Sequence, residues 1–354
     1  MGSEEDRPFS ILKDLLPFCF VSICGIIWIF SSRPNENVPA KNILRKIGTF
    51  MAGGLDMILS KDNKGLGPKK NTDPDEILGL PSTVKRLIFI RHGESDWNDI
   101  FNKGIGLSMI IRLIKALIRE FLLLGTSDSI FLDSPLNEDG TKQAKDLAIF
   151  LSKSESGFSP REELVLQTLR GESSTSVIAT SNLRRAISTT TIALWPRISK
   201  TKEKIVILSS LQEISRNVDA IAISGSGMIP NLSRLTAEFE NPQEFSVERV
   251  YDSSENHGNK SSSFTGIKRL KAFNEWVFKR REDAVIAGGH SLWFKSYFQT
   301  FLPFNTHHIA KTCKITNSGV VSFDLHRAET SDGRVLYRID PASIVVVYGG
   351  FTSK

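Results

Sequence analysis

The feature of this sequence that most constrains its fold is an alternation of apolar runs with helical patterns beyond residue 84. Short runs rich in β-branched residues, typical of buried strands, lie at 86–91, 175–180, 204–209, 284–289 and 342–348. Helical patterns lie at 139–153, 183–195, 264–281 and 291–302. Strands that alternate with helices form a sheet with helices on both faces. We therefore predict an α/β fold, a three-layer α/β/α sandwich with a central, mostly parallel sheet.

The N-terminal part has a different character. Residues 15–32 contain no charged side chain, and their length of 18 residues is close to the lower limit for a membrane-spanning helix. The preceding tail, 1–14, is acidic, and no small-residue cleavage site follows, so an uncleaved anchor is favoured over a signal peptide. A helix buried against its own domain is the remaining alternative. Residues 33–46 hold four basic residues against two in 1–14, which predicts a single-pass membrane protein with a cytosolic C-terminal domain.

Residues 33–81 read as a basic linker, and 82–354 as one folded domain. The stretch 33–70 holds eight Lys and Arg against three acidic residues, so membrane lipid with anionic headgroups is an expected partner. This stretch accounts for much of the net charge of +6, and no nucleic-acid partner is needed to explain it. Of the three cysteines only Cys313 lies in the predicted domain, so no disulfide is expected there.

Charged and polar residues follow the predicted strands where each one ends. His92 directly follows the first run, which ends in Arg91, and His290 directly follows the run 284–289. Glu213 comes soon after 204–209, and a helix that carries Arg184 and Arg185 begins after 175–180. Because ligands of open α/β sheets bind beyond the carboxyl ends of the strands, we expect these side chains to share one site.

These residue types suit the cleavage of a phosphate monoester. Arginine presents a fork of donors that matches phosphate oxygens. A neutral histidine can attack phosphorus, and further cationic or donor groups can stabilise the charge on the transferred phosphoryl group. A protonated glutamate can deliver a proton to the leaving oxygen. The scheme needs no metal and no cofactor, and the sequence has no HExxH or CxxC motif and no glycine-rich nucleotide-binding loop.

Five motifs in this order resemble the histidine phosphatase superfamily, the phosphoglycerate mutase-like family: RHGES, DSPLNEDGTKQA, TSNLRRAISTT, LQEI and GGHS. The resemblance covers roughly residues 85 to 350. It implies a phosphohistidine mechanism without metal or cofactor, in which His92 is the nucleophile and Glu213 the proton donor. It implies that Arg91 and Arg185 grip the phosphate and that His290 completes the pocket.

The resemblance also bears on neighbouring positions. Arg185 is preferred to Arg184 because it directly precedes Ala186, as in the family's helix start. Ser95 and Asn98 stand where family members contact phosphate or substrate. Ser291 occupies the place of the aspartate that donates the proton in the family's acid-phosphatase branch, which puts this chain in the mutase-like branch. We count Ser291 among the expected phosphate-binding residues.

The glutamate motif departs from the mutases proper, because it continues as ISRNVDAIAISGSGMIP rather than in an Arg-x-Tyr-Gly run. This favours a membrane-anchored phosphomonoesterase over a mutase-type phosphotransferase. A non-catalytic membrane scaffold that keeps the fold is a further alternative. Arg216 and Asn217 are candidates for contact with the rest of the substrate, or belong to a solvated loop.

An insertion at about 103–130 separates the first two motifs. Within it, residues 105–124 predict a helix with a basic stripe and a broad apolar face. Three interpretations are open: a core helix packed on the sheet, a cap over the active site, or a helix lying on the bilayer surface.

Overall fold

The computed structural model describes residues 37–67, 71–104, 106–153, 157–173, 175–239 and 245–353. One sheet organises this part of the chain, with the strand order β4-β3-β2-β5-β1-β7-β8 and with β9 paired to β7. The five strands from β4 to β1 run parallel, whereas β7 is antiparallel to β1, β8 and β9. The strands of this sheet are β1 (Ser82–Arg91), β2 (Ser176–Ser181), β3 (Ile205–Leu208), β4 (Tyr251–Asp252), β5 (Ala284–Gly289), β7 (Val320–Glu329), β8 (Val335–Ile339) and β9 (Val345–Tyr348).

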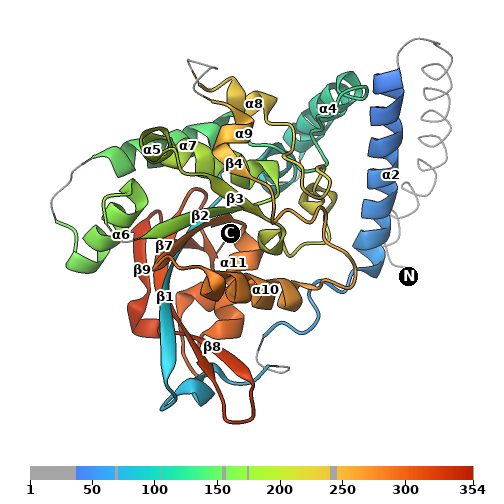
Figure 1. Cartoon of the computed structure of the whole chain (residues 1–354). Coiled ribbons are helices and arrows are strands. Elements are labelled where there is room, and N and C mark those ends of the chain that lie inside the picture. Colours follow the sequence, from blue (N-terminus) through green and yellow to red (C-terminus); the bar gives the residue numbers. More distant parts are fainter. Residues whose placement is uncertain are drawn as a thin grey trace.

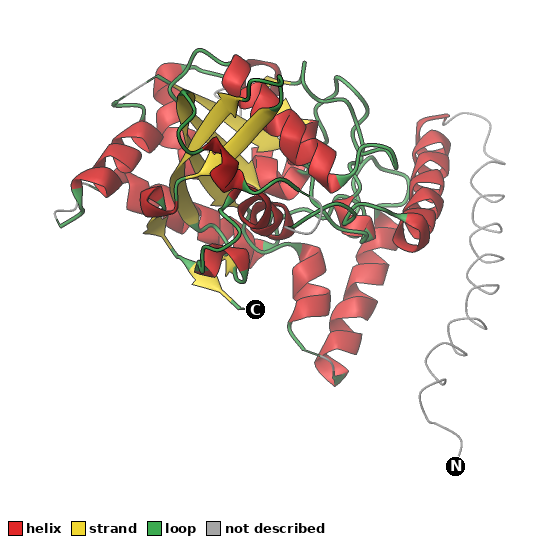
Figure 2. Ribbon diagram, turned by 90° about the horizontal axis from the view of Figure 1, so that it is seen from below, coloured by secondary structure: helices red, strands yellow, loops and turns green. Residues whose placement is uncertain are grey.

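Helices cover both faces of the sheet (Figures 1 and 2). The longer helices of the described residues are α2 (Asn37–Leu59), α4 (Leu107–Leu122), α5 (Glu138–Ser152), α6 (Pro160–Arg170), α7 (Arg184–Thr201), α10 (Gly266–Lys279) and α11 (Ser291–Phe301). Successive residues of a strand point to opposite faces, and the core divides accordingly. Leu87 and Phe89 of β1 pack with α10 and α11, whereas Ile88 and Ile90 pack with α5, α6 and α7. The observed fold is thus a mixed α/β fold with a central, mostly parallel sheet, as predicted.

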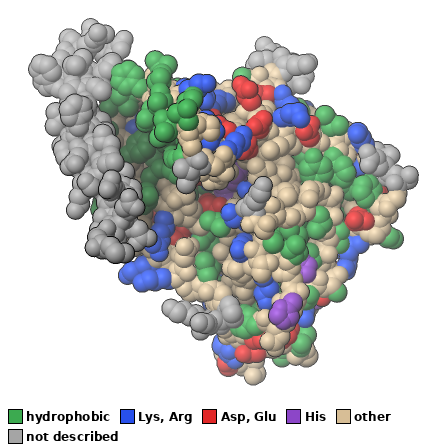
Figure 3. Space-filling view, turned by 180° about the vertical axis from the view of Figure 1, so that it is seen from behind, with side chains coloured by type: hydrophobic (Ala, Val, Ile, Leu, Met, Phe, Trp, Pro, Cys, Tyr) green, Lys and Arg blue, Asp and Glu red, His purple; other side chains and the backbone are tan. Residues whose placement is uncertain are grey.

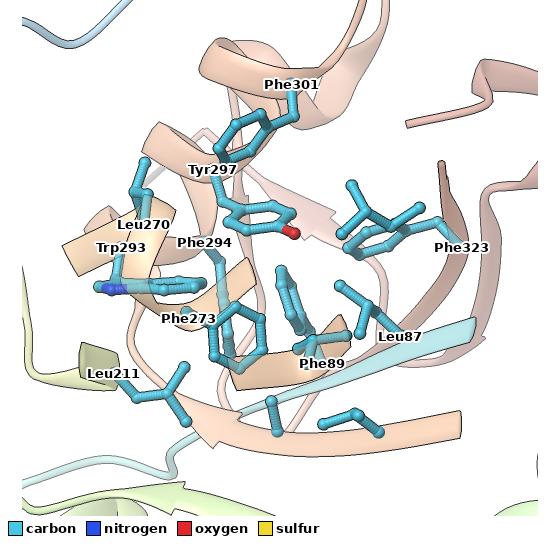
Figure 4. Close-up of a cluster of buried hydrophobic side chains, with 14 of the residues drawn as sticks. Leu87, Phe89, Leu211, Leu270, Phe273, Trp293, Phe294, Tyr297, Phe301 and Phe323 are labelled. Atoms are coloured by element: carbon cyan, nitrogen blue, oxygen red, sulfur yellow. The ribbon is translucent and has the colours of Figure 1, made fainter. Parts of the chain in front are cut away.

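The core on the α10 and α11 side is aromatic, and it fixes the helix that follows His290 (Figure 4). Phe89 of β1 stacks on Phe294 of α11 with ring centroids 4.2 Å apart, and Phe323 of β7 meets Phe89 edge-on at 4.9 Å. Trp293 is fully buried, and its indole Nε1 donates to the backbone oxygen of Ser210 at 2.8 Å. Such packing fixes the position of the first turn of α11 relative to the end of β1.

The structure contains an element for each strand and helix expected in the domain, with ends that differ by a few residues. It also contains β7, β8 and α6, which the sequence pattern did not predict. The long hairpin of β7 and β8 extends the sheet beyond β1, and β7 shields the edge of β1 that a purely parallel sheet would leave open.

The N-terminal part differs from its prediction where it is described. The segment expected to be a linker, 33–81, contains the helix α2 and a short 3-10 helix, Pro74–Ile77. Ile43 and Lys46 of α2 are buried, and Gly53 lies close to Val218 and Ile221, because apolar and small residues recur on the helix face turned to the domain. The predicted anchor, 15–32, lies outside the described residues. Among the described helices, none is both long and apolar enough to cross a bilayer.

The insertion forms the predicted helix as α4, but the core interpretation is wrong. The apolar face of α4 is largely exposed, and the side turned to the protein consists of Leu113, Ala116 and Glu120. The carboxylate of Glu120 forms an ion pair with Lys46 at 3.8 Å and accepts from the Ser129 hydroxyl at 3.0 Å, so a polar network, together with a small apolar cluster, holds the helix.

Candidate active site

The site lies where β1 and β5 end side by side. The register pairs Arg91 with Gly289, and the backbone N–H of His92 donates to the carbonyl of Gly289 at 3.0 Å. His92 and His290 therefore follow neighbouring strand ends, and their ring centroids are 5.1 Å apart. Both rings are buried. The sheet topology explains why two histidines nearly 200 residues apart in sequence meet.

The ring of His92 is oriented by its own backbone neighbourhood. Its Nδ1 lies 2.6 Å from the carbonyl oxygen of Gly93, which can only accept, so Nδ1 carries the proton. In the neutral ring this leaves the lone pair on Nε2. Burial, followed by the charges of Arg185 and Arg91, lowers the pKa of His92 well below its usual value. The imidazole is thus held neutral, with its proton on Nδ1 and its lone pair on Nε2.

A glycine pair positions the turn after His92. A Cβ on Gly93 would lie 2.5 Å from the carbonyl oxygen of Gly140, and one on Gly140 would lie 2.0 Å from that of Glu94. The N-terminal turn of α5 therefore packs directly against this backbone, which only glycine permits. The RHGES and NEDG motifs are therefore in direct backbone contact, and each needs its glycine because a side chain there would clash with the other segment.

A residue of β2 orients the ring of His290. Its Nε2 lies 2.8 Å from the hydroxyl of Ser181, the last residue of that strand. Burial, with the nearby charges of Arg185, His92 and Arg91, lowers the pKa of His290 well below its usual value.

The two expected phosphate-binding arginines are buried, and each is fixed through part of its guanidinium. Nη1 of Arg91 donates to the carbonyl of Ile315 at 2.5 Å. Nη1 of Arg185 donates to the carbonyl of Asp219 at 2.7 Å, and its Nη2 lies 3.3 Å from that residue's carboxylate. Burial lowers the pKa of Arg91 to about 10, which still leaves it charged at neutral pH.

Arg184 points elsewhere. Its guanidinium is paired with Asp128 and Asp133 and donates to the carbonyls of Ser129 and Leu132. These contacts tie the start of α7 to the segment before α5. Arg184 is therefore a structural residue, and the preference for Arg185 agrees with the geometry.

Glu213 lies under the first turn of α11. Its carboxylate accepts from the backbone N–H of Trp293 at 2.9 Å and of Leu292 at 3.4 Å, and from its own neighbour Ile214 at 2.9 Å. Burial raises the pKa of Glu213, against the lowering effect of Arg185 and of these N–H donors. A buried carboxyl with a raised pKa is the form a proton donor needs.

A buried ion cluster holds the backbone of Glu213. Lys260 and Arg269 both donate to the carbonyl of Glu213, and both pair with Asp62, which follows α2. Burial would raise the pKa of Asp62, but its bonds with Arg269 and Lys260 outweigh burial and lower it. The N-terminal segment of the described chain thereby supports the loop of the expected proton donor.

The other residues expected to bind phosphate or substrate, Ser95, Asn98 and Ser291, differ in their contacts and burial. Ser95 is fully buried, but its hydroxyl caps α3 (Asp96–Asn102) by accepting from the N–H of Asn98. The Asn98 side chain is half-buried and accepts from Asn102. Ser291 is buried in the first turn of α11, directly after His290.

Arg216 and Asn217 are exposed on the loop that follows Glu213, in line with the solvated-loop interpretation.

The site combines positive charge with unpaired buried nitrogens. Among the described residues, Nε of Arg91, Nε of Arg185 and Nδ1 of His290 are buried and make no hydrogen bond within the chain. A buried donor left unpaired costs free energy, so such a set is suited to an anionic ligand. Chemically, the arrangement offers a neutral imidazole that can act as a nucleophile, cationic donors that can bind an anion, and a buried acid.

Sequence reasoning missed the residues that hold this set in place. Ser181 could have been found, since it ends a strand at the same edge as the two histidines. Asp219, Asp62 and Lys260 carry no local signal, because each acts on a residue distant in sequence or across a loop.

Comparisons with known proteins give a weak structural likeness. No family model matches the chain, and no curated protein matches it. Among solved structures, "Mycobacterial hydrolase 1" is 16% identical, with 76% of this chain and 100% of that chain covered and a TM-score of 0.35. A mycobacterial glucosyl-3-phosphoglycerate phosphatase, in a complex with VO3, is 15% identical, with 72% and 97% covered and a TM-score of 0.35.

The alpha-ribazole phosphatase from Shigella flexneri is 13% identical, with 72% and 95% covered and a TM-score of 0.32. Two of these three proteins are phosphatases by name. At such TM-scores the likeness supports no inference about function. A functional proposal therefore rests on the geometry of the site.

Proposed function

We propose that this protein is a phosphomonoesterase of the histidine phosphatase type, with His92 as the nucleophile. The observation that carries the proposal is the neutral, oriented His92 beside unpaired buried nitrogens of Arg91, Arg185 and His290. A site with this composition binds a dianionic phosphoryl group and brings a nucleophile to it. The retention of every group in the scheme is the reason to favour an enzyme over a scaffold.

In the first step, Nε2 of His92 attacks phosphorus, and the bond from phosphorus to the ester oxygen breaks. The leaving oxygen takes the proton of the Glu213 carboxyl and departs as an alcohol. Arg91, Arg185 and His290 stabilise the negative charge on the three other oxygens. Phosphohistidine on His92 and the carboxylate of Glu213 result.

In the second step, water replaces the alcohol. The Glu213 carboxylate takes a proton from that water, which attacks phosphorus in line with the bond to Nε2. This bond breaks, inorganic phosphate leaves, and His92 and protonated Glu213 are regenerated. Ser95, Asn98 and Ser291 contribute contacts to phosphate or substrate in this scheme.

We also propose that the enzyme is anchored to a membrane by residues 15–32, with the catalytic domain on the cytosolic side. The support is the uncharged stretch and the excess of basic residues after it. Membrane lipid and a phosphorylated substrate are then its partners, and the proposed reaction requires neither metal nor cofactor.

The proposal is tested by phosphate release from a panel of sugar, lipid, nucleotide and protein phosphomonoesters, with full-length protein and excess chelator. We expect release from at least one class, and we expect His92→Ala to lower it by about 10⁶-fold or below detection. Thermal unfolding of both proteins controls for folding. Release that persists in His92→Ala, or that chelator abolishes, would contradict the proposal, and transfer of phosphate to an isomeric product would favour a mutase.

A further inference from the structure

The outward side of α4 is an almost continuous apolar surface. Its members are large side chains, each about half exposed or more: Leu107, Ile110, Ile111, Ile114, Leu117, Ile118, Phe121 and Leu122. They recur three or four residues apart, so they form one stripe along the helix. The residues that face the protein, Leu113, Ala116 and Glu120, lie on the other side. An amphipathic helix of a globular domain normally turns its apolar stripe inward, whereas α4 turns it outward.

The charges of α4 complement an anionic surface. The only acidic residue of the helix is Glu120, which is buried and paired with Lys46. The basic residues Arg112, Lys115 and Arg119 follow one another along a single edge of the stripe. Basic side chains that border an apolar face are typical of helices that lie in the headgroup region of a bilayer.

A second apolar stripe lies on α2. Leu44, Met51, Leu55 and Ile58 are exposed and share one face of that helix. The two helices are joined, since Lys46 of α2 donates to the carbonyl of Leu123 at 2.6 Å and Asn42 to that of Gly125 at 3.1 Å. Hydrophobic side chains gather at this corner of the molecule, at the upper left of Figure 3. Patches of this kind on a soluble domain mark an interaction surface.

We propose that the stripes of α4 and α2 form a docking surface for an anionic lipid bilayer. The basic edge of α4 provides the charge complementarity. The position along the chain provides a second argument, because the uncharged segment 15–32 ends only a few residues before α2 begins at Asn37. The surface next to a predicted anchor is thus apolar and basic. The proposal is independent of the catalytic scheme.

Photolabelling tests this proposal with full-length protein. The probe is a phosphatidylcholine that carries a diazirine on its acyl chain, in phosphatidylcholine vesicles with or without phosphatidylserine. After irradiation, adducts are mapped by mass spectrometry. We expect adducts within 107–122, with a higher yield when phosphatidylserine is present, because the basic edge adds electrostatic attraction.

A matched pair of variants supplies the control. Ile114→Glu with Leu117→Glu should reduce adducts on 107–122 to background, whereas Ile149→Glu on α5 should leave them unchanged. Ile149 is as exposed as the two α4 residues, at 54% against 51% and 53%. Adducts confined to 15–32 would overturn the proposal and leave that segment, or a second copy of the chain, as the occupant. Equal labelling without phosphatidylserine would contradict the function of the basic edge.

Discussion

Two adjacent arginines at the start of α7 have different environments. Arg184 is enclosed by Asp128 and Asp133, and Arg185 faces the two histidines with one nitrogen unpaired. We expect Arg184→Gln to lower the free energy of unfolding by about 3–5 kcal/mol, because it leaves buried carboxylates without a partner. Urea denaturation measures this loss. Little change in stability would show that the Arg184 pairs contribute no more than surface pairs do.

Arg185→Lys tests the other half of this contrast. Lysine keeps the charge but loses the planar fork, so we expect kcat/KM to fall by about 10²–10³-fold with the protein still folded. Steady-state kinetics beside thermal unfolding separates the two effects. A variant as active as the wild type would remove Arg185 from the phosphate site.

Glu213 is expected to protonate the leaving oxygen. Glu213→Gln keeps the shape of the side chain but cannot donate an acidic proton. We expect a large loss of kcat for alkyl phosphates and a small one for aryl phosphates, whose leaving groups need less protonation. The comparison of the two substrates on one variant is its own control for folding. Equal losses on both would argue against Glu213 as the acid.

The same carboxyl predicts the pH dependence. Burial raises the pKa of Glu213, so the acid form persists to higher pH than for an exposed glutamate and is lost as pH rises through that raised pKa. For alkyl phosphates, kcat should therefore fall on this limb. With Glu213→Gln the limb should disappear, and a profile of unchanged shape would assign it to another group.

At the residue scale, the gathering of His92, His290 and Glu213 at one site could be predicted from sequence, whereas most of the residues that hold them in place could not. His92, His290 and Glu213 follow strands directly or within a short turn, so the sheet edge brings them together. Asp219 fixes Arg185, and Lys260 and Asp62 hold the backbone of Glu213, through contacts that depend on loop geometry. A linear pattern contains no information on such contacts.

At the scale of elements, the segment after α2 is joined to the site. Asp62 pairs with Lys260 and Arg269, all nearly or fully buried, and both partners donate to the Glu213 carbonyl. Asp62→Asn leaves two buried cations without their carboxylate, so we expect a loss of about 3–5 kcal/mol in unfolding free energy and a lower kcat. Asp146→Asn, which removes the exposed Lys142 pair, is the matched control and should cost about 0–1 kcal/mol.

The low pKa of Asp62 also gives this stabilisation a pH dependence. Stability from a carboxyl whose pKa is lowered on folding is present above its ordinary pKa and is lost as pH falls through the lowered one. Acid unfolding of the wild type and of Asp62→Asn should therefore converge at low pH. Curves that remain separated there would locate the effect elsewhere.

The elements themselves divide by the strength of their signals. Apolar runs predicted β1, β2, β3 and β5 because these parallel strands are largely buried on both faces. The hairpin of β7 and β8 contains partly exposed residues, and charged or polar residues interrupt its apolar runs. The sequence pattern therefore did not predict it. Helix α4 was predicted, but its amphipathicity could not show which face turns inward. Only the contacts of Ala116 and Glu120 with the domain decide that question.

At the scale of the whole molecule, the three layers explain how one site forms from distant segments. The aromatic core on one face fixes α11, and with it the N–H groups that hold Glu213. The opposite core fixes α5 and α7, which bring Gly140 and Arg185 to the end of β1. The order of the strands could be inferred only from the family resemblance, since apolar runs do not specify their neighbours.

The central claim is that a phosphoryl group is transferred to His92. The most direct measurement is rapid mixing of full-length protein with substrate, quenching in alkali, and mass mapping of the peptide that contains His92. We predict an added phosphoryl group on this residue that forms and decays at rates consistent with kcat, is acid-labile, and is absent in His92→Ala. Steady turnover without any phosphorylated His92, or a phosphoenzyme that persists in His92→Ala, would contradict the mechanism.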